Sequence, residues 1–489
     1  MKLIAIFLTS ASLLTSCGEV PENDEETDNE SSSALTEETA ELENQRLYND
    51  TLPDNLNADG KTIRFLSGEI PGSTFHSVMT GSEDSEGELI NDCIHEANLA
   101  IMDRFNISVE EERQSFDGVT TSARKIVNSG DDAYDIISGI DRDVYSMAAE
   151  NMIIPLDTLI YVDLSQPWWN ESINESLTIG GRLWAGYSDA MLTSYDFTHI
   201  LLFNKGMISM YNLDNPYDYV MEGTWTFDKF TTMAETVASD INGDQIWDEN
   251  DRYGWLAVPK HIAPTIWIAS GTQSITKDEN GIPVYSMNTD TRIVDAMQLA
   301  YDMSWGNTFW YQTSVRDAAD VQNPAIFSQN NALFSSTAFY SLFSGYYREM
   351  EFDYGIIPYP KFDEAQDKYY TRIEGGNISF VPITCKDADF AGAMLEAYAC
   401  EFKNTVIPAY YETSLKVKYS RDDASSQIID MMMENRIYDL GDTLFCNQLR
   451  DGFVASAFNS KKVLSVSMLQ KAEKVMTTAI TSLVEQLID

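Results

Sequence analysis

Residues 62–72 carry the sequence Thr62-Ile63-Arg64-Phe65-Leu66-Ser67-Gly68-Glu69-Ile70-Pro71-Gly72. The first five residues are typical of a β-strand, and the Gly and Pro residues that follow predict a loop at its carboxyl end. A helix is expected next over residues 91–105, followed by strands at 107–109 and 134–137. Strands that alternate with helices at this spacing predict a mainly parallel sheet in an α/β fold, in which ligands gather beyond the carboxyl ends of the strands.

The same alternation continues through the rest of the chain. A helix is expected over Val466–Leu487, and a polar surface loop between Lys361 and Tyr370. Further strands are expected at Leu183–Tyr187, Thr198–Asn204, Ala332–Ser335 and Asp353–Ile357. The 429 residues from Lys61 to Asp489 exceed what one hydrophobic core usually organises, so two domains are predicted.

The N-terminus has the pattern of an export signal. Lys2 precedes an apolar run from Leu3 to Leu14, which is too short to span a bilayer because a spanning helix needs about 20 apolar residues. The small residues before Cys17 resemble the lipobox of bacterial lipoproteins, which predicts that Cys17 is the first mature residue and carries the lipid. An ordinary secretory signal with a chance cysteine is the alternative.

Residues 18–60 are strongly acidic. They contain 14 acidic residues and only one basic residue, Arg46. Such a segment buries too little apolar surface to offset its ordering entropy, so it is predicted to be a disordered tether.

Charge and cysteine spacing exclude several classes of function. The formal net charge of −45 argues against nucleic-acid binding, which relies on clustered Lys and Arg, and it also disfavours anionic ligands. Cys93, Cys385, Cys400 and Cys446 form no CxxC motif, which excludes a zinc ribbon or a thioredoxin-like site. Buried free thiols and a Cys385–Cys400 disulfide both remain open.

Residues 240–251 have the ligand spacing of a calcium loop. Oxygen-bearing groups fall at loop positions 1, 3, 5, 7, 9 and 12, and the residue at position 7 would offer its backbone carbonyl. Position 6 is Gln245 where such loops favour Gly, and position 12 is Asp instead of Glu. A structural calcium site and a metal-free acidic loop are therefore both possible, and we do not expect the ion to take part in chemistry. The six candidate ligands are Asp240, Asn242, Asp244, Ile246, Asp248 and Asp251.

Motifs of catalysis are not found in the sequence. It contains no GxxxxGK[ST], GxSxG, HExxH or GxGxxG motif, and only four histidines. A pair of catalytic carboxylates, as in a glycoside hydrolase, stays open because 77 acidic residues supply such pairs by chance. The 9 Trp, 25 Tyr and 22 Phe are suited to stacking on the apolar face of a sugar ring, although a given Trp is more often a core residue.

The order of short motifs along the chain resembles the extracellular solute-binding proteins of ABC importers, in particular the sugar-binding family 1. The resemblance runs from about Lys61 nearly to the end of the chain. Its pieces are Arg104-Phe105-Asn106-Ile107, Tyr134-Asp135-Ile136-Ile137, Pro155-Leu156, Leu201-Leu202-Phe203-Asn204-Lys205, Gly223 to Asp228, Tyr253-Gly254 after the acidic loop, and Asp353 to Lys361.

This resemblance implies a periplasmic-binding-protein-like fold of type II, in which two α/β lobes joined by a hinge close on a ligand. The chain would cross between the lobes near residues 192–198, 360–377 and 410–416. Lobe 1 would comprise residues 61–195 and about 370–412, and lobe 2 residues 196–369 and about 413–489.

The resemblance also suggests ligand-binding residues. Glu69 follows the first strand, Asp141 and Arg142 follow the strand at 134–137, and Asp196 lies at the first crossing. Phe339 or Tyr340 falls where relatives place a stacking aromatic, and Trp267 is a weaker aromatic candidate. Maltose-type relatives carry a tryptophan shortly before their acid and arginine pair, where this chain has Gly139, which argues against maltodextrin itself.

Together these features predict a monomeric, non-enzymatic lipoprotein on the extracellular face of the bacterial membrane. It would bind a carbohydrate, with an oligosaccharide expected, and deliver it to the permease of an ABC importer. A secreted glycoside hydrolase and a binding protein for a peptide or another polar solute are the alternatives.

Overall fold

The computed structural model describes residues 46–70, 73–81, 88–305, 309–312, 316–419 and 422–488, with the side chains of 311–321 and 417–419 left out. Cys17 and most of the predicted tether lie outside this part of the chain. The folded unit spans Tyr48–Asp489. The prediction of disorder up to residue 60 is wrong at its end, because Leu52 is buried in the core and Asp50 pairs with Arg104.

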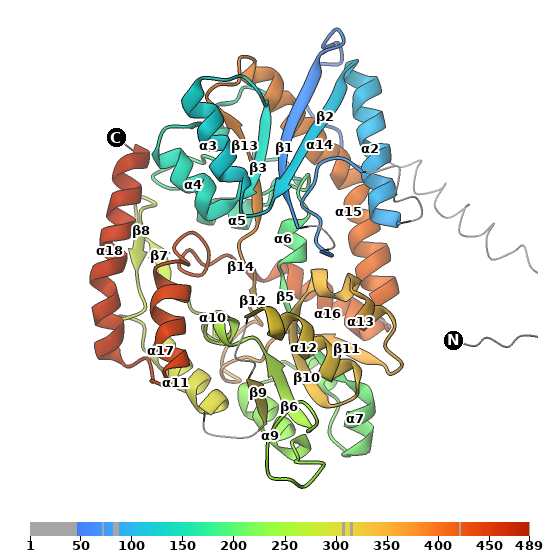
Figure 1. The fold of residues 1–489 in the computed structure, drawn as a ribbon, viewed down its shortest axis with the longest axis vertical. Coiled ribbons are helices and arrows are strands. Elements are labelled where there is room, and N and C mark those ends of the chain that lie inside the picture. The colour runs from blue at the N-terminus through green and yellow to red at the C-terminus, as the bar shows by residue number, and fades with distance from the viewer. Residues whose placement is uncertain are drawn as a thin grey trace, which may run out of the picture. The chain divides into compact units, whose positions relative to one another are not determined.

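Two five-stranded sheets organise the folded unit (Figure 1). The first has the order β2-β1-β3-β13-β4, in which β1 runs parallel to β2 and β3, and β13 runs antiparallel to β3 and β4. Its strands are β1 (Thr62–Glu69), β2 (Ser108–Ser115), β3 (Ile136–Ile140), β4 (Ile153–Ile154) and β13 (Asn377–Pro382). The helices α2 (Leu89–Phe105), α3 (Val119–Ser129), α4 (Asp141–Ala149) and α14 (Ala388–Asn404) pack against it.

The second sheet has the order β11-β5-β10-β6-β9. Its strands are β5 (His199–Asn204), β6 (Tyr253–Ala257), β9 (Trp310–Gln312), β10 (Ala332–Ala338) and β11 (Tyr354–Ile357). The helices α7 (Lys205–Met210), α8 (Pro216–Met221), α9 (Phe227–Val237), α12 (Arg316–Ser328) and α16 (Asp423–Glu434) pack against it. Because β5 pairs antiparallel with both β10 and β11, this sheet is mixed and not mainly parallel.

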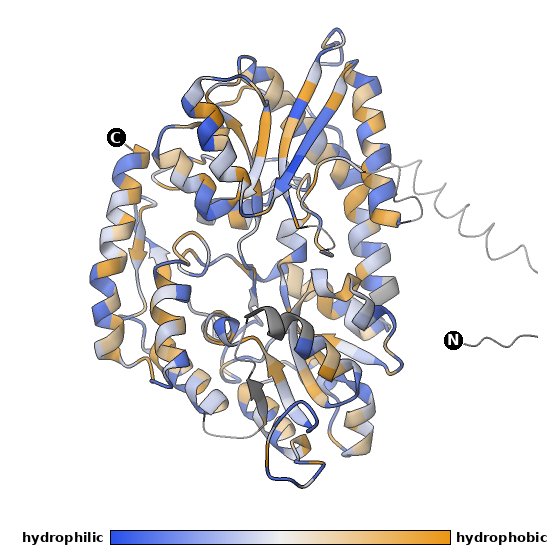
Figure 2. Cartoon of the chain, viewed as in Figure 1, coloured by the Kyte–Doolittle hydropathy of each residue, from blue (hydrophilic) through white to orange (hydrophobic). Residues whose placement is uncertain are grey.

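Hydropathy separates the central strands from the edge of the first sheet. β2 is hydrophilic, in contrast to the more hydrophobic interior strands (Figure 2). β2 is the edge strand, and its run Glu110-Glu111-Glu112-Arg113 places charges along that edge. Charged edge strands disfavour pairing with another chain.

The two sheets are connected by segments that run side by side. The first crossing contains α6 (Thr193–Asp196) and continues into β5, and Thr198 bridges Ile373 of the return crossing in antiparallel fashion. Gly375 passes so close to α4 that a Cβ atom there would lie 2.3 Å from the Asp141 carboxylate. The π-helical segment η4 (Ala409–Tyr419) lies at the third predicted crossing and packs against both α2 and α16.

The remaining elements surround this frame. The C-terminal helix α18 (Val466–Ile488) packs against both α4 and β8, which the expected boundaries assign to different lobes. The others are η2 (Leu156–Thr158), α5 (Glu171–Leu177), α10 (Pro259–Ala269), β7 (Ile275–Lys277), β8 (Pro283–Tyr285), α11 (Thr291–Trp305), η3 (Phe339–Phe343), α13 (Gly345–Arg348), β12 (Thr371–Arg372), α15 (Val406–Pro408), β14 (Arg436–Ile437), η5 (Leu449–Val454) and α17 (Ala455–Asn459).

Two further expectations are decided by the structure. The strand expected at Leu183–Tyr187 is absent, and only Gly186 of this buried stretch forms an isolated bridge, to Ser379. The four described cysteines are free thiols, so Cys385 and Cys400 form no disulfide. Within the described residues, none of the helices has both the length and the apolar character needed to cross a membrane.

Candidate functional site

A cavity of about 400 Å³ lies between the loop that follows β1 and the second sheet. Residues 73–75 form one wall, and β6, α10, α12, β10 and the return crossing contribute to the others. The volume is in the range of small-molecule sites, roughly 300–1,000 Å³. Its aromatic and hydroxyl-bearing lining residues are Ser73, Thr74, Phe75, Trp255, Thr265, Ser336, Thr337, Tyr340, Ser341, Ser344, Tyr346, Tyr347 and Tyr359.

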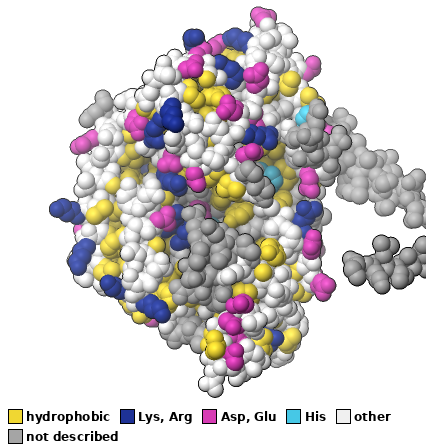
Figure 3. All heavy atoms as spheres, in the orientation of Figure 1, with side chains coloured by type: hydrophobic (Ala, Val, Ile, Leu, Met, Phe, Trp, Pro, Cys, Tyr) yellow, Lys and Arg dark blue, Asp and Glu magenta, His cyan; other side chains and the backbone are white. Residues whose placement is uncertain are grey.

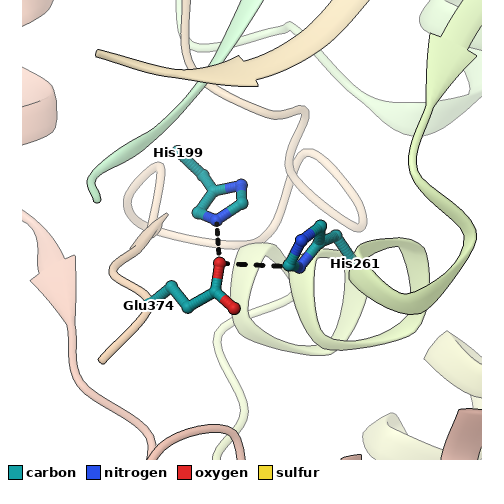
Figure 4. A group of neighbouring side chains, drawn as sticks. All are labelled: His199, His261 and Glu374. Atoms are coloured by element: carbon teal, nitrogen blue, oxygen red, sulfur yellow. Dashed lines mark hydrogen bonds and ion pairs between the residues drawn. The ribbon is translucent and has the colours of Figure 1, made fainter. Parts of the chain in front are cut away.

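Three titratable side chains from distant parts of the sequence meet on the lining of this cavity (Figure 4). His199 is the first residue of β5, His261 lies in the first turn of α10, and Glu374 follows β12 on the return crossing. Glu374 Oε2 lies 3.4 Å from His199 Nε2 and 3.7 Å from His261 Nδ1. The expected binding residues include none of these three.

The buried guanidinium of Arg372 occupies the position that a metal ion would need between the two imidazoles. Its Nη1 lies 2.7 Å from His199 Nε2 and 3.0 Å from His261 Nδ1. Burial, together with the positive charge of Arg372, lowers the pKa of His199 to about 4, and burial lowers the pKa of His261 well below its ordinary value. Both imidazoles are therefore neutral at pH 7, and with the guanidinium in place the group does not fit a metal site.

The cations beneath the cavity each have a carboxylate partner. Arg372 donates two hydrogen bonds to Asp442, at 2.6 and 2.9 Å, and both side chains are fully buried. Arg450 donates to Asp451 at 2.8 and 3.0 Å and to Glu374 at 2.9 Å. Such bidentate, charge-assisted bonds fix the geometry of the cluster.

Two described polar side chains on the cavity wall, Asn323 and Ser344, have atoms that lack hydrogen-bond partners. Asn323 on α12 is 3% exposed, and neither its amide oxygen nor its amide nitrogen has a hydrogen-bond partner among the described residues. Leaving a buried polar group unpaired costs about 1–3 kcal/mol. Nearby Trp255 is satisfied, because its Nε1 donates to Ser336 Oγ at 2.7 Å.

Of the binding residues expected from the sequence, Tyr340 lines the cavity. Its ring lies 5.9 Å from that of Phe75 and 5.6 Å from that of Phe197, and Thr74 Oγ1 donates to its carbonyl oxygen at 2.7 Å. The neighbouring Phe339 is fully buried. Trp267 is also fully buried, inside α10, so in this structure it presents no face to a ligand.

The expected charged residues lie elsewhere. Asp196 is fully buried and accepts hydrogen bonds from the backbone N–H of His76 and the Tyr410 hydroxyl. Asp141 is buried at the start of α4, accepts from the hydroxyls of Tyr187 and Tyr438, and has a pKa raised by burial.

Arg142 and Glu69 are also away from the cavity lining. The Arg142 guanidinium lies 3.7 Å from the Asp143 carboxylate, and the partly exposed Glu69 lies 3.8 Å from Arg113. The structure therefore does not bring the expected polar residues together at the cavity.

The acidic loop 240–251 projects between α9 and β6, where acidic side chains gather at the lower end of the view in Figure 3. Gln245 adopts a positive φ of 65°, so it makes the sharp turn at position 6 despite not being Gly. Asp240 accepts hydrogen bonds from the backbone N–H groups of Gly243 and Gln245. Buried Asp251 accepts from those of Ile241 and Asp248. Each carboxylate oxygen has lone pairs left for a cation.

Calcium binding by this loop stays a prediction of the sequence. Calcium added to chelator-treated protein, at about ten times its dissociation constant, should raise the free energy of unfolding by about 1.4 kcal/mol. Asp244→Ala should abolish the gain, while Glu249→Ala, at loop position 10, should retain it. Calorimetric titration of calcium into the wild type and each variant, up to the millimolar range, measures the binding on which this gain depends. No binding to the wild type in that range would refute the prediction.

No family model matches the chain, and no curated protein matches its sequence. Solved structures do match it. One is the maltose/maltodextrin-binding domain MalE from Bdellovibrio bacteriovorus bound to maltotriose, with a TM-score of 0.55 and 15% identity over 86% of this chain and 100% of that chain. Another is MalE from Listeria monocytogenes in complex with maltose, with a TM-score of 0.57 and 14% identity over 87% and 99%.

A third match binds a different kind of solute. UgpB from Mycobacterium tuberculosis, in complex with glycerophosphocholine, has a TM-score of 0.54 and 16% identity over 81% of this chain and 96% of that chain. The identities are low, but nearly the whole length of each relative is matched, and the predicted fold class is confirmed. The chain therefore has the two-lobed type II α/β fold of the solute-binding proteins of ABC importers.

Proposed function

We propose that this chain is an extracellular solute-binding lipoprotein that captures a carbohydrate in the cavity and delivers it to an ABC permease. The observation that carries the proposal is the cavity itself. Its walls combine aromatic rings such as Trp255 and Tyr340 with the hydroxyl and amide groups of Ser336, Thr337 and Asn323. Aromatic faces suit the C–H face of a sugar ring, and the polar groups suit its hydroxyls.

Closure of the lobes would couple binding to delivery. Residues 73–76, which follow β1, contact η3 beyond the second sheet through the Thr74–Tyr340 hydrogen bond and the first crossing through the His76–Asp196 hydrogen bond. A ligand that touches both walls favours the closed arrangement, because only there does it make all of its contacts. Two of the matched structures are described as maltose-binding, which favours binding over catalysis.

The sequence of the N-terminus supports the anchor. The pattern that ends at Cys17 resembles a lipobox, and the acidic segment after it would give reach from the membrane. A receptor held near its permease acts at high effective concentration.

A thermal-shift panel tests the proposal. It holds neutral oligosaccharides, short peptides and glycerophosphodiesters, and a ligand at 100 times its dissociation constant should stabilise the protein by about 2.7 kcal/mol. We expect an oligosaccharide to give this stabilisation. Tyr340→Ala should raise the dissociation constant of that oligosaccharide at least about tenfold, because it removes an aromatic ring from the cavity wall. Tyr161→Ala, a partly buried tyrosine outside the cavity lining, is the matched control.

Stabilisation by peptides or glycerophosphodiesters alone would refute the carbohydrate assignment. Cleavage of the bound oligosaccharide during incubation would refute the assignment as a non-enzymatic binding protein.

A further inference from the structure

The charges beneath the cavity balance one another. Among the described residues of this cluster the cations are Lys260, Arg372 and Arg450, and the anions are Glu374, Asp442 and Asp451. Each cation lies within 4 Å of at least one of these carboxylates. We call these six charged residues the floor of the cavity. The floor offers a charged ligand no unpaired counter-charge.

The two histidines add hydrogen-bonding capacity without adding charge. Arg372 Nη1 lies 2.7 Å from Nε2 and 3.4 Å from Nδ1 of His199 and 3.0 Å from Nδ1 of His261, which places a positive charge beside both rings and favours their neutral forms. A neutral imidazole keeps one N–H group to donate, and a sugar hydroxyl accepts such a bond.

Two described side chains on the cavity wall, Asn323 and Ser344, carry buried polar atoms without a partner, and the amide of Asn323 is the more deeply buried. It is nine-tenths or more buried, on the cavity lining, and unpaired at both Oδ1 and Nδ2. An amide offers one acceptor and one donor group side by side, which matches two adjacent hydroxyls, each of which both donates and accepts. A carboxylate on the ligand would satisfy only its N–H side, and an ammonium only its oxygen.

We propose that the cavity selects an uncharged ligand with adjacent hydroxyl groups over acidic and basic counterparts, and that Asn323 is a specificity-determining residue. This inference rests on the proposed function, because it names the class of carbohydrate. A ligand that brought its own charge to the floor would bury it without a partner, which is strongly unfavourable.

Trisaccharides of matched length test the selection at pH 7. Maltotriose, cellotriose and N,N′,N″-triacetylchitotriose are neutral, trigalacturonate is anionic and triglucosamine is cationic. We expect at least one neutral trisaccharide to bind about 100-fold or more tightly than either charged one, measured by calorimetry. Tighter binding of trigalacturonate or triglucosamine would overturn the selection while leaving the proposed function intact.

Variants of Asn323 separate a role in specificity from a role in structure. Asn323→Ala should weaken the binding of the neutral trisaccharide by about tenfold or more, because the substitution removes both hydrogen-bonding groups. Asn323→Asp has nearly the same shape, and it should also shift the preference toward triglucosamine, which a merely structural role would not do. Unchanged selectivity in Asn323→Asp would overturn the assignment of this residue.

The balance of charge is tested without any sugar. Glu374→Ala leaves Lys260 and Arg450 with fewer counter-charges, so acetate should raise the melting temperature of this variant more than chloride at equal ionic strength, and not that of the wild type. If acetate and chloride change the melting temperature of Glu374→Ala equally, the inferred balance of charge beneath the cavity is wrong. If no trisaccharide binds but acetate rescues the variant, the floor is as inferred and the carbohydrate assignment fails.

Discussion

Asp442→Asn is expected to lower the free energy of unfolding by about 3–5 kcal/mol. The Asp442 carboxylate accepts two hydrogen bonds from Arg372 and lies 3.3 Å from Arg450 Nη1, and the side chains of Asp442 and Arg372 are fully buried. The substitution removes the negative charge and leaves a guanidinium in a water-excluded place with only partial hydrogen bonding. Urea unfolding monitored by tryptophan fluorescence measures the change.

The matched control is the exposed pair between Lys61 and Asp387, whose side chains are about half exposed. Asp387 also caps α14, and Asn caps a helix equally well, so Asp387→Asn should cost less than about 1 kcal/mol. Replacing both buried partners, in Arg372→Met with Asp442→Leu, should destabilise less than Asp442→Asn alone. If the free energy of unfolding of Asp442→Asn lies within about 1 kcal/mol of the wild-type value, the buried pair does not stabilise the hinge region as described.

The local sequence pattern predicted the buried strands near the centres of the two sheets. Thr62–Glu69 and His199–Asn204 are rich in branched and aromatic residues and lie near the centres of the two sheets. Leu183–Tyr187 has the same character, but it meets β13 only through the single bridge from Gly186 to Ser379 and forms no continuous ladder with it. Hydrophobicity reports burial, whereas a strand also requires a partner supplied by distant parts of the chain.

The site was harder to predict for a related reason. Trp267 is the tryptophan that the resemblance suggests for the site, and it is buried, as are Trp168 and Trp169, whereas Trp255 and Tyr340 line the cavity. An aromatic residue in the core and one on a cavity wall have the same local sequence. Only the packing of the second sheet distinguishes them.

The polar floor shows the same limit more sharply. His199, His261 and Glu374 are separated by 62 and 113 residues, and the hinge brings them together. The scarcity of histidine was an available signal, since two of the four histidines in the chain meet here. Asn323 carried no such signal, because its importance follows from burial without a partner.

Two of the buried tryptophans hold a buried acid. Glu396 on α14 is fully buried and accepts hydrogen bonds from Trp168 Nε1 and Trp169 Nε1, each at 2.9 Å, and from the backbone N–H of Asp163 at 3.2 Å. None of the described ion pairs includes Glu396. Burial therefore outweighs these hydrogen bonds, and the pKa of Glu396 rises from 4.5 to about 7.

This raised pKa makes the stability of the fold depend on pH with a definite sign. Because the folded state binds the Glu396 proton more tightly than the unfolded state, the stabilisation from this proton is complete below pH 4.5 and is lost as the pH rises through about 7. The wild type should therefore lose roughly 3 kcal/mol relative to Glu396→Gln, which does not titrate, between pH 4 and pH 8. Urea unfolding of both proteins across this range gives the difference directly. Trp169→Phe removes one donor to the carboxylate, so the transition should move to higher pH. A difference that stays flat from pH 4 to pH 8 would show that Glu396 ionises in the folded state as easily as in the unfolded chain.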